Sequence, residues 1–440
     1  MTREPTKPDG SRRLPATVWL LSWVSLLADI SGEMMYPLLP LFLVGVLGAS
    51  KIQVGAIEGL ALLMVALMSA YAGWKSDRLG MFGPSRVPWI RWGYGLPVLG
   101  KGLIAVAAIW PLVLAGRLLD RLGKGLRGAP RDALLADAVD ESQRGQAFGL
   151  HRALDTIGAL LGVLLAALLF WWWSGSPEGA IGLPAESASG PAVDIWAYRA
   201  VFATAALLGL GSWLLTFIIQ EPQGNGLPQA DRPEDASERT SGQTAPASAG
   251  EPGLRSSLGR KYWLTLCVLA LFSLANSSDT FLLLRASELG YSPWEVVLVY
   301  ALFNATYALG SYPAGNLSDR WGRWSMISVG WVLYAGVYFA FASLEQPGAW
   351  WVWPLMAIYG FYMALTEGVG KALIADCAPV ELRGRAMGIF HATSGVATLL
   401  ASLLVGFLWE QSGPAWALAS SGLIACSALA LFWFCKKSSR

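Results

Sequence analysis

The chain has 440 residues, of which 54% are hydrophobic and only 14% are charged, with a net charge of +2. Soluble domains carry about 25% charged residues, so the composition excludes an ordinary soluble protein, and the near-neutral charge gives no support to a nucleic-acid partner. The four cysteines lack CxxC spacing and predict neither a disulfide framework nor a zinc site.

Apolar stretches recur along the chain, six on each side of a polar segment. We expect membrane spans at 17–45, 51–75, 90–110, 111–136, 144–173, 199–219, 261–285, 293–317, 324–344, 350–376, 383–410 and 414–435. The polar segment is rich in Pro, Gly, Ser and Ala and cannot bury enough apolar surface to order itself. The predicted organisation is an N-terminal tail (1–16), a six-helix bundle (17–220), a flexible linker (221–260), a second six-helix bundle (261–435) and a short tail (436–440).

Lysine and arginine gather in alternate loops and at both termini. The other face of the expected membrane protein has only Lys51, Arg199 and Arg285. Because positively charged loops stay on the cytoplasmic side, we expect both termini and the linker to be cytoplasmic and the loop at 174–198 to be external. The sequence therefore predicts a multi-pass protein of the cytoplasmic (inner) membrane.

The loop after the second expected span recurs after the eighth. Its residues in the two copies are Gly73, Asp77, Arg78 and Gly80, then Gly315, Asp319, Arg320 and Gly322. A second pair of matching segments ends at Asp137 and Asp376. Two related halves of six helices are typical of a duplicated transporter whose substrate site lies between the halves, near the middle of the bilayer.

With this repeated G-x-x-x-D-R-x-G loop, the chain resembles the major facilitator superfamily, in which the loop is called motif A. The resemblance covers the chain outside the linker. It implies an all-α membrane protein with twelve transmembrane helices in two pseudo-symmetric six-helix bundles. It also implies that the motif A residues act in conformational change, because in the family this loop latches the cytoplasmic side during outward opening.

The fourth and fifth spans resemble two further motifs of the superfamily, with departures. Arg117 begins a segment similar to motif B, in which Asp120, Arg121 and Lys124 replace a glutamine, a glycine and a small residue. Three glycines match motif C of the proton-driven exporters: Gly149, Gly158 and Gly162. Because Val163 replaces the proline of motif C, the resemblance favours proton antiport without establishing it.

Ionisable side chains at bilayer depth cost about 2.5–3.5 kcal/mol each, so those that occur are usually paired, water-facing and functional. Asp29 and Glu33 are four residues apart in the first span, which places both carboxyls on one helical face. Two like charges so close hinder each other's ionisation, as proton coupling requires. We expect Asp155 in the fifth span to join them, whereas the seventh span has the single acid Asp279.

Basic residues follow one stripe of the fourth span, so an interior cavity would contain both acids and bases. The candidates for substrate binding or charge pairing are Arg121, Lys124, Lys101, Asp120, Asp279, Glu367 and Lys371. Static salt bridges are the alternative interpretation, and Glu367 and Lys371 can simply pair with each other. His151 and His391 are either proton carriers or hydrogen-bonded structural residues.

The predicted function is secondary active transport of a small solute by alternating access, as proton-coupled export. The alternatives are symport or facilitated uptake of an organic anion, and a lipid-handling or sensor protein with the same fold. Phosphate-loop, metal-site and hydrolase motifs are missing from the sequence, which argues against an enzyme or a primary pump. We expect no cofactor, a proton gradient as the energy source, and a monomer whose partners are substrate, protons and the lipid bilayer.

Overall fold

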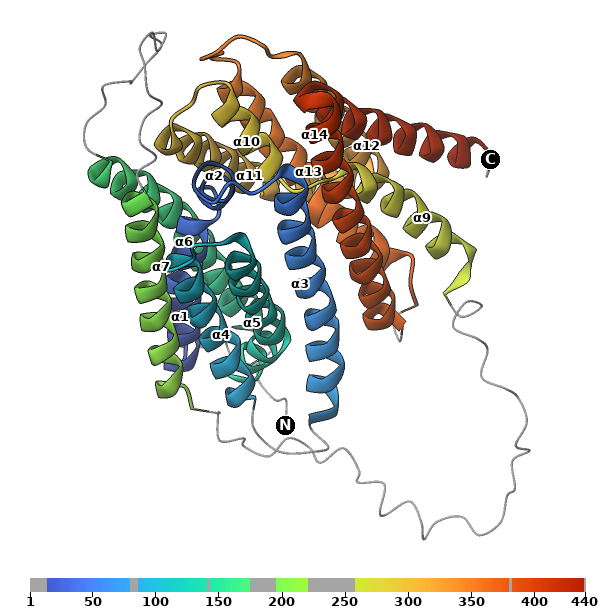
Figure 1. The fold of residues 1–440 in the computed structure, drawn as a ribbon. Helices are drawn as coiled ribbons and strands as arrows, with labels where there is room; N and C mark the ends of the chain where they lie inside the picture. Colours follow the sequence, from blue (N-terminus) through green and yellow to red (C-terminus); the bar gives the residue numbers. More distant parts are fainter. Residues whose placement is uncertain are drawn as a thin grey trace.

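The computed structural model describes residues 14–79, 86–140, 143–174, 195–220, 258–379 and 382–438. Every regular element within these residues is a helix (Figure 1). The first half contains α1 (Ala16–Met35), α2 (Leu39–Leu41), the π-helical η1 (Phe42–Val46), α3 (Lys51–Leu79), α4 (Val87–Ala105), α5 (Trp110–Asp137), α6 (Arg144–Trp173), α7 (Ile195–Leu215) and the 3-10 turn η3 (Thr216–Ile218). The second half contains α9 (Gly259–Ala275), α10 (Thr280–Glu288), α11 (Pro293–Trp321), α12 (Arg323–Ser343), α13 (Val352–Asp376) and α14 (Arg383–Ser438).

Each expected membrane span corresponds to a helical segment, so the all-α fold class with its twelve transmembrane helices is confirmed. The first span comprises α1, α2 and η1, and the seventh comprises α9 and α10. Two arms of α14 form the last two spans, separated by the non-helical Gly413. Length and composition alone mark seven segments of the described chain as apolar enough to cross a membrane.

Local sequence signals explain where several helices begin and end. Ser292 and Glu295 form a reciprocal capping box at the start of α11. Gly322 separates α11 from α12 with a φ of 87°, a left-handed conformation that favours glycine. Gly413 has a φ of 84° and is followed by Pro414, which together end the first arm of α14.

Each half is a bundle, and the two halves meet along two helix pairs. In the first half α4 packs on α5 and α7, α1 packs on α6 and α7, and α3 packs on α5. In the second half α9 packs on α14, α11 on α13, and α12 on both α13 and α14. The most extensive contacts between the halves run from α3 to α14 and from α6 to α11, and α2 also touches α10. Figure 1 shows the first half, blue to green, beside the second half, yellow to red.

Glycine lets helices approach closely at both kinds of contact. A Cβ atom on Gly162 of α6 would lie 2.5 Å from the carbonyl oxygen of Ile30 on α1. A Cβ atom on Gly55 of α3 would lie 2.3 Å from the carbonyl oxygen of Ser402 on α14. These separations are too short for any side chain, so glycine is required for the observed backbone contact.

We call the end of the molecule where α1 begins the terminal end. We call the opposite end, where α10 lies, the distal end. At the distal end the halves are tied together: Lys51 Nζ lies 3.0 Å from Glu288 Oε1, and the indole of Trp409 donates to the same oxygen at 3.1 Å. Towards the terminal end, Leu309 and Tyr312 of α11 expose 76% and 79% of their surface. The described side-chain contacts therefore join the halves at the distal end, whereas α11 has exposed side chains towards the terminal end.

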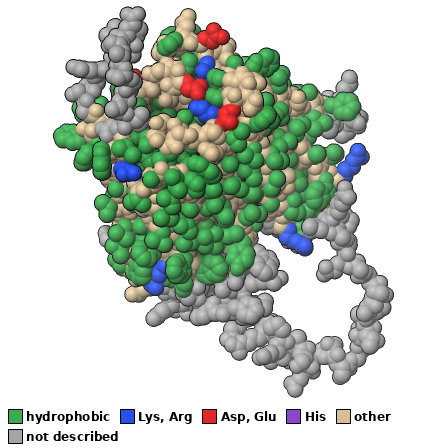
Figure 2. Space-filling view, in the orientation of Figure 1, with side chains coloured by type: hydrophobic (Ala, Val, Ile, Leu, Met, Phe, Trp, Pro, Cys, Tyr) green, Lys and Arg blue, Asp and Glu red, His purple; other side chains and the backbone are tan. Residues whose placement is uncertain are grey.

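The outer face of the bundles is suited to lipid. Figure 2 shows hydrophobic side chains over most of the visible surface, with acidic side chains near its upper edge and further Lys or Arg side chains at the other edges. Exposed aromatic residues include Trp171, Trp172 and Trp173 at the end of α6. Such tryptophans are typical of the interface between membrane and water.

Candidate functional site

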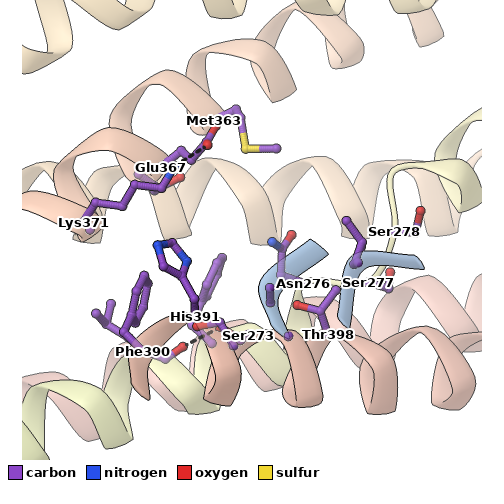
Figure 3. Close-up of a pocket in the computed structure, with 18 of the residues that line it drawn as sticks. Ser273, Asn276, Ser277, Ser278, Met363, Glu367, Lys371, Phe390, His391 and Thr398 are labelled. Atoms are coloured by element: carbon purple, nitrogen blue, oxygen red, sulfur yellow. Dashed lines mark hydrogen bonds and ion pairs between the residues drawn. The ribbon is translucent and has the colours of Figure 1, made fainter. Parts of the chain in front are cut away.

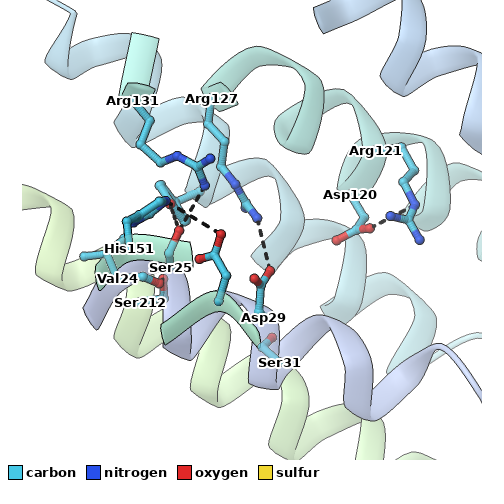
Figure 4. Close-up of polar contacts among 12 residues, drawn as sticks. Val24, Ser25, Asp29, Ser31, Asp120, Arg121, Arg127, Arg131, His151 and Ser212 are labelled. Carbon is cyan, nitrogen blue, oxygen red and sulfur yellow. Dashed lines mark hydrogen bonds and ion pairs between the residues drawn. The ribbon is translucent and has the colours of Figure 1, made fainter. Parts of the chain in front are cut away.

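The two acids of α1 lie where the halves meet, and they have different partners. Asp29 Oδ1 is 4.0 Å from a guanidinium nitrogen of Arg127 on α5 (Figure 4). Glu33 Oε2 accepts a hydrogen bond of 3.1 Å from the hydroxyl of Tyr300 on α11. Asp29 is therefore paired within the first half, and Glu33 connects the first half to the second.

Asp120 on α5 is the centre of a cluster of cations. Its carboxylate lies 4.0 Å from Lys101 Nζ, 3.7 Å from Arg117 and 3.7 Å from Arg121 Nε. Lys101 is almost fully buried and donates a hydrogen bond of 2.6 Å to Ser31 Oγ. The structure thus brings together three helices, α1, α4 and α5, around residues that the sequence marked as charge partners.

Arg117 has a second and stronger partner. Its Nε and NH2 atoms donate to the two carboxylate oxygens of Glu58 on α3, at 2.9 and 2.8 Å. Both side chains are buried, and the guanidinium also lies 5.4 Å from the centre of the Tyr36 ring. Sequence reasoning missed this pair, although a single acid inside an apolar span opposite a basic span is a signal for it.

Lys124 remains accessible. Its side chain is exposed, and the charges that act on it most strongly are Arg121, Asp29 and Glu33. Because Glu33 contacts the second half, Lys124 lies on the side of α5 that faces the space between the halves. Its ammonium group is therefore exposed and lies within electrostatic reach of both carboxylates of α1.

Asp155 lies in the same region but faces a different partner. Its Oδ2 atom is 3.7 Å from Nε2 of His151, one turn earlier on α6. Asp155 also interacts electrostatically with Asp29, as a like charge. The sequence-based grouping of Asp155 with the acids of α1 thus has a spatial basis, and His151 belongs to this cluster.

A cavity of about 500 Å³ lies against the second half, between α3, α9, α12, α13 and α14 (Figure 3). Its polar wall includes Ser273, Asn276, Asp279, Thr366, Glu367, Lys371, His391, Ser394 and Thr398. Its aromatic wall includes Tyr36, Phe272, Trp331, Tyr362 and Phe390. The cavity combines a mostly apolar surface with a few polar groups, as ligand sites usually do.

Glu367 and Lys371 form an ion pair of 2.8 Å within this cavity, as their spacing allows. The Tyr307 hydroxyl also donates to Glu367. Both charged side chains remain exposed, at 41% and 45%. The pair is therefore accessible, and a substrate or another charged residue can compete for either member.

Asp279 lies at the other side of the cavity, in the break between α9 and α10. It accepts a hydrogen bond of 2.6 Å from Tyr359 of α13, and Tyr362 donates to the neighbouring Asn276 at 3.1 Å. Hydropathy identifies these tyrosines only as apolar span residues, so their role as donors was missed. The regular occurrence of Tyr along α12 and α13 is the signal that could have revealed it.

The motif residues have several different placements. Gly73, Asp77 and Arg78 are described only as part of the backbone of α3, and Gly80 lies outside the described residues. In the second copy, Asp319 lies 3.3 Å from Arg323, which also pairs with Asp376, whereas Gly315 has open space around it. Arg320 is exposed.

The motif C-like glycines divide into two kinds. Gly158 and Gly162 pack against the backbone of α1, where a Cβ atom would lie 2.6 and 2.5 Å from carbonyl oxygens. Gly149 has no atom within 4 Å of the position a Cβ would take. Helix packing thus requires glycine at positions 158 and 162 but not at position 149.

The chain resembles known proteins both in sequence and in fold. The sequence profile of the Major Facilitator Superfamily matches residues 21–369 and 286–440. An uncharacterized MFS-type transporter of Methanocaldococcus jannaschii is 28% identical over 431 residues, covering 97% of this chain and 96% of the relative. The multidrug resistance protein MdtL of Escherichia coli is 24% identical over 424 residues, covering 92% and 93%. A solved variant of the nucleoside transporter NupG has a TM-score of 0.73 at 12% identity, covering 94% of this chain and 100% of that chain.

Proposed function

Because this chain belongs to the major facilitator superfamily, we propose that it exports a small solute across the cytoplasmic membrane in exchange for protons. Family membership makes it a membrane transporter and not an enzyme. The similarity to a multidrug resistance protein supports export. One chain encloses a complete cavity, which supports a monomer as the working unit.

The proposal rests on where the two acids of α1 lie: Asp29 is beside a cation of the first half, and Glu33 contacts the second half. Asp29 faces the guanidinium group of Arg127, and Glu33 accepts a hydrogen bond from the hydroxyl of Tyr300. Hydrogen bonds to an ionised acceptor are about twice as strong as those between neutral groups. Protonation of Glu33 therefore weakens a contact between the halves, and protonation of Asp29 releases Arg127 and the accessible Lys124.

The arrangement of the halves supplies the alternating access. Contacts join the halves at the distal end, and exposed side chains of α11 lie towards the terminal end, so we take the cavity to open at the terminal end. We assign the terminal end to the cytoplasm, because the basic loops of the sequence lie there. This state therefore loads substrate from the cytoplasm, as an exporter requires.

The test is transport by purified protein in proteoliposomes with an imposed pH gradient. The variants Asp29→Asn and Glu33→Gln are expected to lose most of the acceleration that the gradient gives to the wild type. Glu345→Gln, which neutralises an exposed acid after α12, is the matched control and keeps it. Full dependence on the gradient in both α1 variants would overturn the proposed coupling.

A second candidate function is uptake of an organic anion by symport or uniport. The observation that favours it is the basic face of α5, where Lys124 is exposed and Nε of Arg121 is buried without a hydrogen-bond partner. Counterflow measured with the pH gradient in both directions separates the two functions. An antiporter and a symporter respond to reversal of the gradient with opposite sign.

A further inference from the structure

The seventh span is interrupted where it borders the cavity. Helix α9 ends at Ala275, Asn276 has non-helical angles (φ −80°, ψ 74°), and α10 begins at Thr280. The C-terminal end of a helix carries partial negative charge and carbonyl groups without helical partners. Asp279 precedes α10, but its side chain makes no capping hydrogen bond to that helix. The carboxylate is therefore available to the cavity, and it lies between the negative end of α9 and the positive end of α10.

Asp279 differs from the other buried acids in its charged surroundings. Among the described residues it forms no ion pair, and the charges that act on it most strongly are Glu367, Glu58 and Glu33, all acidic. By contrast, Glu58 is paired with Arg117, and Glu367 with Lys371. An unpaired charge at bilayer depth costs several kcal/mol. The site around Asp279 thus favours a positive charge that the described protein does not itself supply.

The rest of the cavity determines what kind of cation fits. Aromatic rings from four helices line it, and Phe272 stacks on Trp331 with ring centres 4.5 Å apart. Ring faces attract cations and also bury apolar groups. The volume of about 500 Å³ matches a drug-sized organic molecule, for which sites of about 300–1,000 Å³ are usual. Figure 3 shows the residues of the break, Asn276 to Ser278, lining this space across from Glu367.

We propose that Asp279 anchors an organic cation with an apolar body, held by its carboxylate and by the aromatic wall of the second-half cavity. As the substrate of the transporter, this cation rests on the proposed function. Its binding, however, requires neither a gradient nor the acids of α1. The proposal thus assigns substrate charge recognition to the second half and proton binding to the first.

The test is equilibrium binding of radiolabelled tetraphenylphosphonium to the full-length protein in detergent, with binding to empty micelles subtracted. Tetraphenylborate has the same shape and the opposite charge. We expect the wild type to bind the cation at least tenfold more tightly than the anion. We expect Asp279→Asn to lose at least tenfold in affinity for the cation, and Asp279→Glu to restore most of it. Glu345→Gln, which neutralises an exposed acid outside this cavity, should bind the cation like the wild type.

Two results would overturn the proposal. One is unchanged binding of the cation by Asp279→Asn that elutes as a folded monomer. The other is equal affinity of the wild type for the two ions, which requires no variant and decides the matter even if Asp279→Asn does not fold. Neither result affects the proteoliposome test of Asp29 and Glu33. Conversely, transport without proton coupling would leave the binding site intact, so the two proposals can fail separately.

Discussion

At the scale of single residues, charge inside the first half is held mainly as ion pairs with hydrogen bonds. The clearest case is Arg117 and Glu58, whose two hydrogen bonds measure 2.9 and 2.8 Å and whose side chains are almost completely buried. Breaking a buried pair by removing one partner costs about 3–5 kcal/mol, because the remaining charge is left uncompensated. The stability of the α3–α5 contact therefore depends on both partners together.

We expect Glu58→Gln to be strongly destabilising, by about 3–5 kcal/mol, because it removes the hydrogen-bonded carboxylate from the buried Arg117 guanidinium. The other carboxylate near Arg117, Asp120 at 3.7 Å, is shared with Lys101 and Arg121. Thermal unfolding in detergent measures the effect. The control is Glu367→Gln, which breaks an exposed pair and should cost less than about 1 kcal/mol. The double variant Glu58→Leu with Arg117→Met should recover much of the lost stability. A melting temperature of Glu58→Gln equal to the wild type would contradict this account.

The sequence predicted which residues carry charge at bilayer depth, but not how they pair. The spacing of Asp29 and Glu33 places them on one face of a helix, because helical periodicity is a local property. Their partners, Arg127 and Tyr300, come from α5 and α11. Such pairings depend on how helices pack, which the periodicity of one segment does not contain. For the same reason the hydrogen bond from Tyr359 to Asp279 was not predicted: the recurring tyrosines of α13 mark donors, but not their partner.

At the scale of elements, α6 is held against α1 by glycine. The resemblance to motif C directs attention to Gly158 and Gly162, and both lie where α6 touches the backbone of α1. Helices in a membrane associate largely through close packing, so small residues at the contact are decisive. Because α1 carries Asp29 and Glu33, the same contact also fixes the position of these acids.

We expect Gly162→Ala to force α6 away from α1, because the new methyl group would lie 2.5 Å from the carbonyl oxygen of Ile30. The melting temperature in detergent and the transport rate should both fall. Gly149→Ala is the matched control: it places a methyl group in open space on the same helix and removes the helical cost of glycine, about 1 kcal/mol. Equal melting temperatures for the two variants would show that the α1–α6 contact adapts without loss.

Hydropathy predicted the spans better than it predicted their interruptions. The expected span 261–285 is broken between Ala275 and Thr280, and the polar sequence Asn-Ser-Ser-Asp was the available signal. A window average over about 20 residues hides a four-residue break, because the flanking segments are strongly apolar. The two arms of α14 were separated correctly, since Gly413 and Pro414 mark their boundary in the sequence.

At the scale of the whole molecule, the contacts at the distal end decide which side of the cavity is open. Lys51 from the first half contacts Glu288 from the second, and Glu410 accepts a hydrogen bond of 3.0 Å from the backbone N–H of Ile52. The polar contacts lie beside the tight packing of Gly406 on Lys51. In the proposed mechanism, alternating access requires all of these contacts to separate, so they would stabilise a state that is open at the terminal end.

Covalent closure of the distal end should therefore stop transport while leaving the cavity accessible. Lys51→Cys with Glu288→Cys, in a background without Cys267, Cys377, Cys426 and Cys435, provides two thiols for a short bifunctional reagent. We expect the cross-linked protein to lose transport in proteoliposomes and to recover it when the link is reduced. Each single cysteine variant, treated in the same way, is the control.

The same cross-linked protein should still bind tetraphenylphosphonium, because the cavity is reached from the terminal end and the link lies at the distal end. Loss of transport with retained binding is the signature of a transporter held in one of its two access states, since binding needs one state and transport needs both. Full transport by the cross-linked protein would mean that the halves do not separate at Lys51 and Glu288. Loss of binding would instead show that the distal contacts form part of the binding cavity.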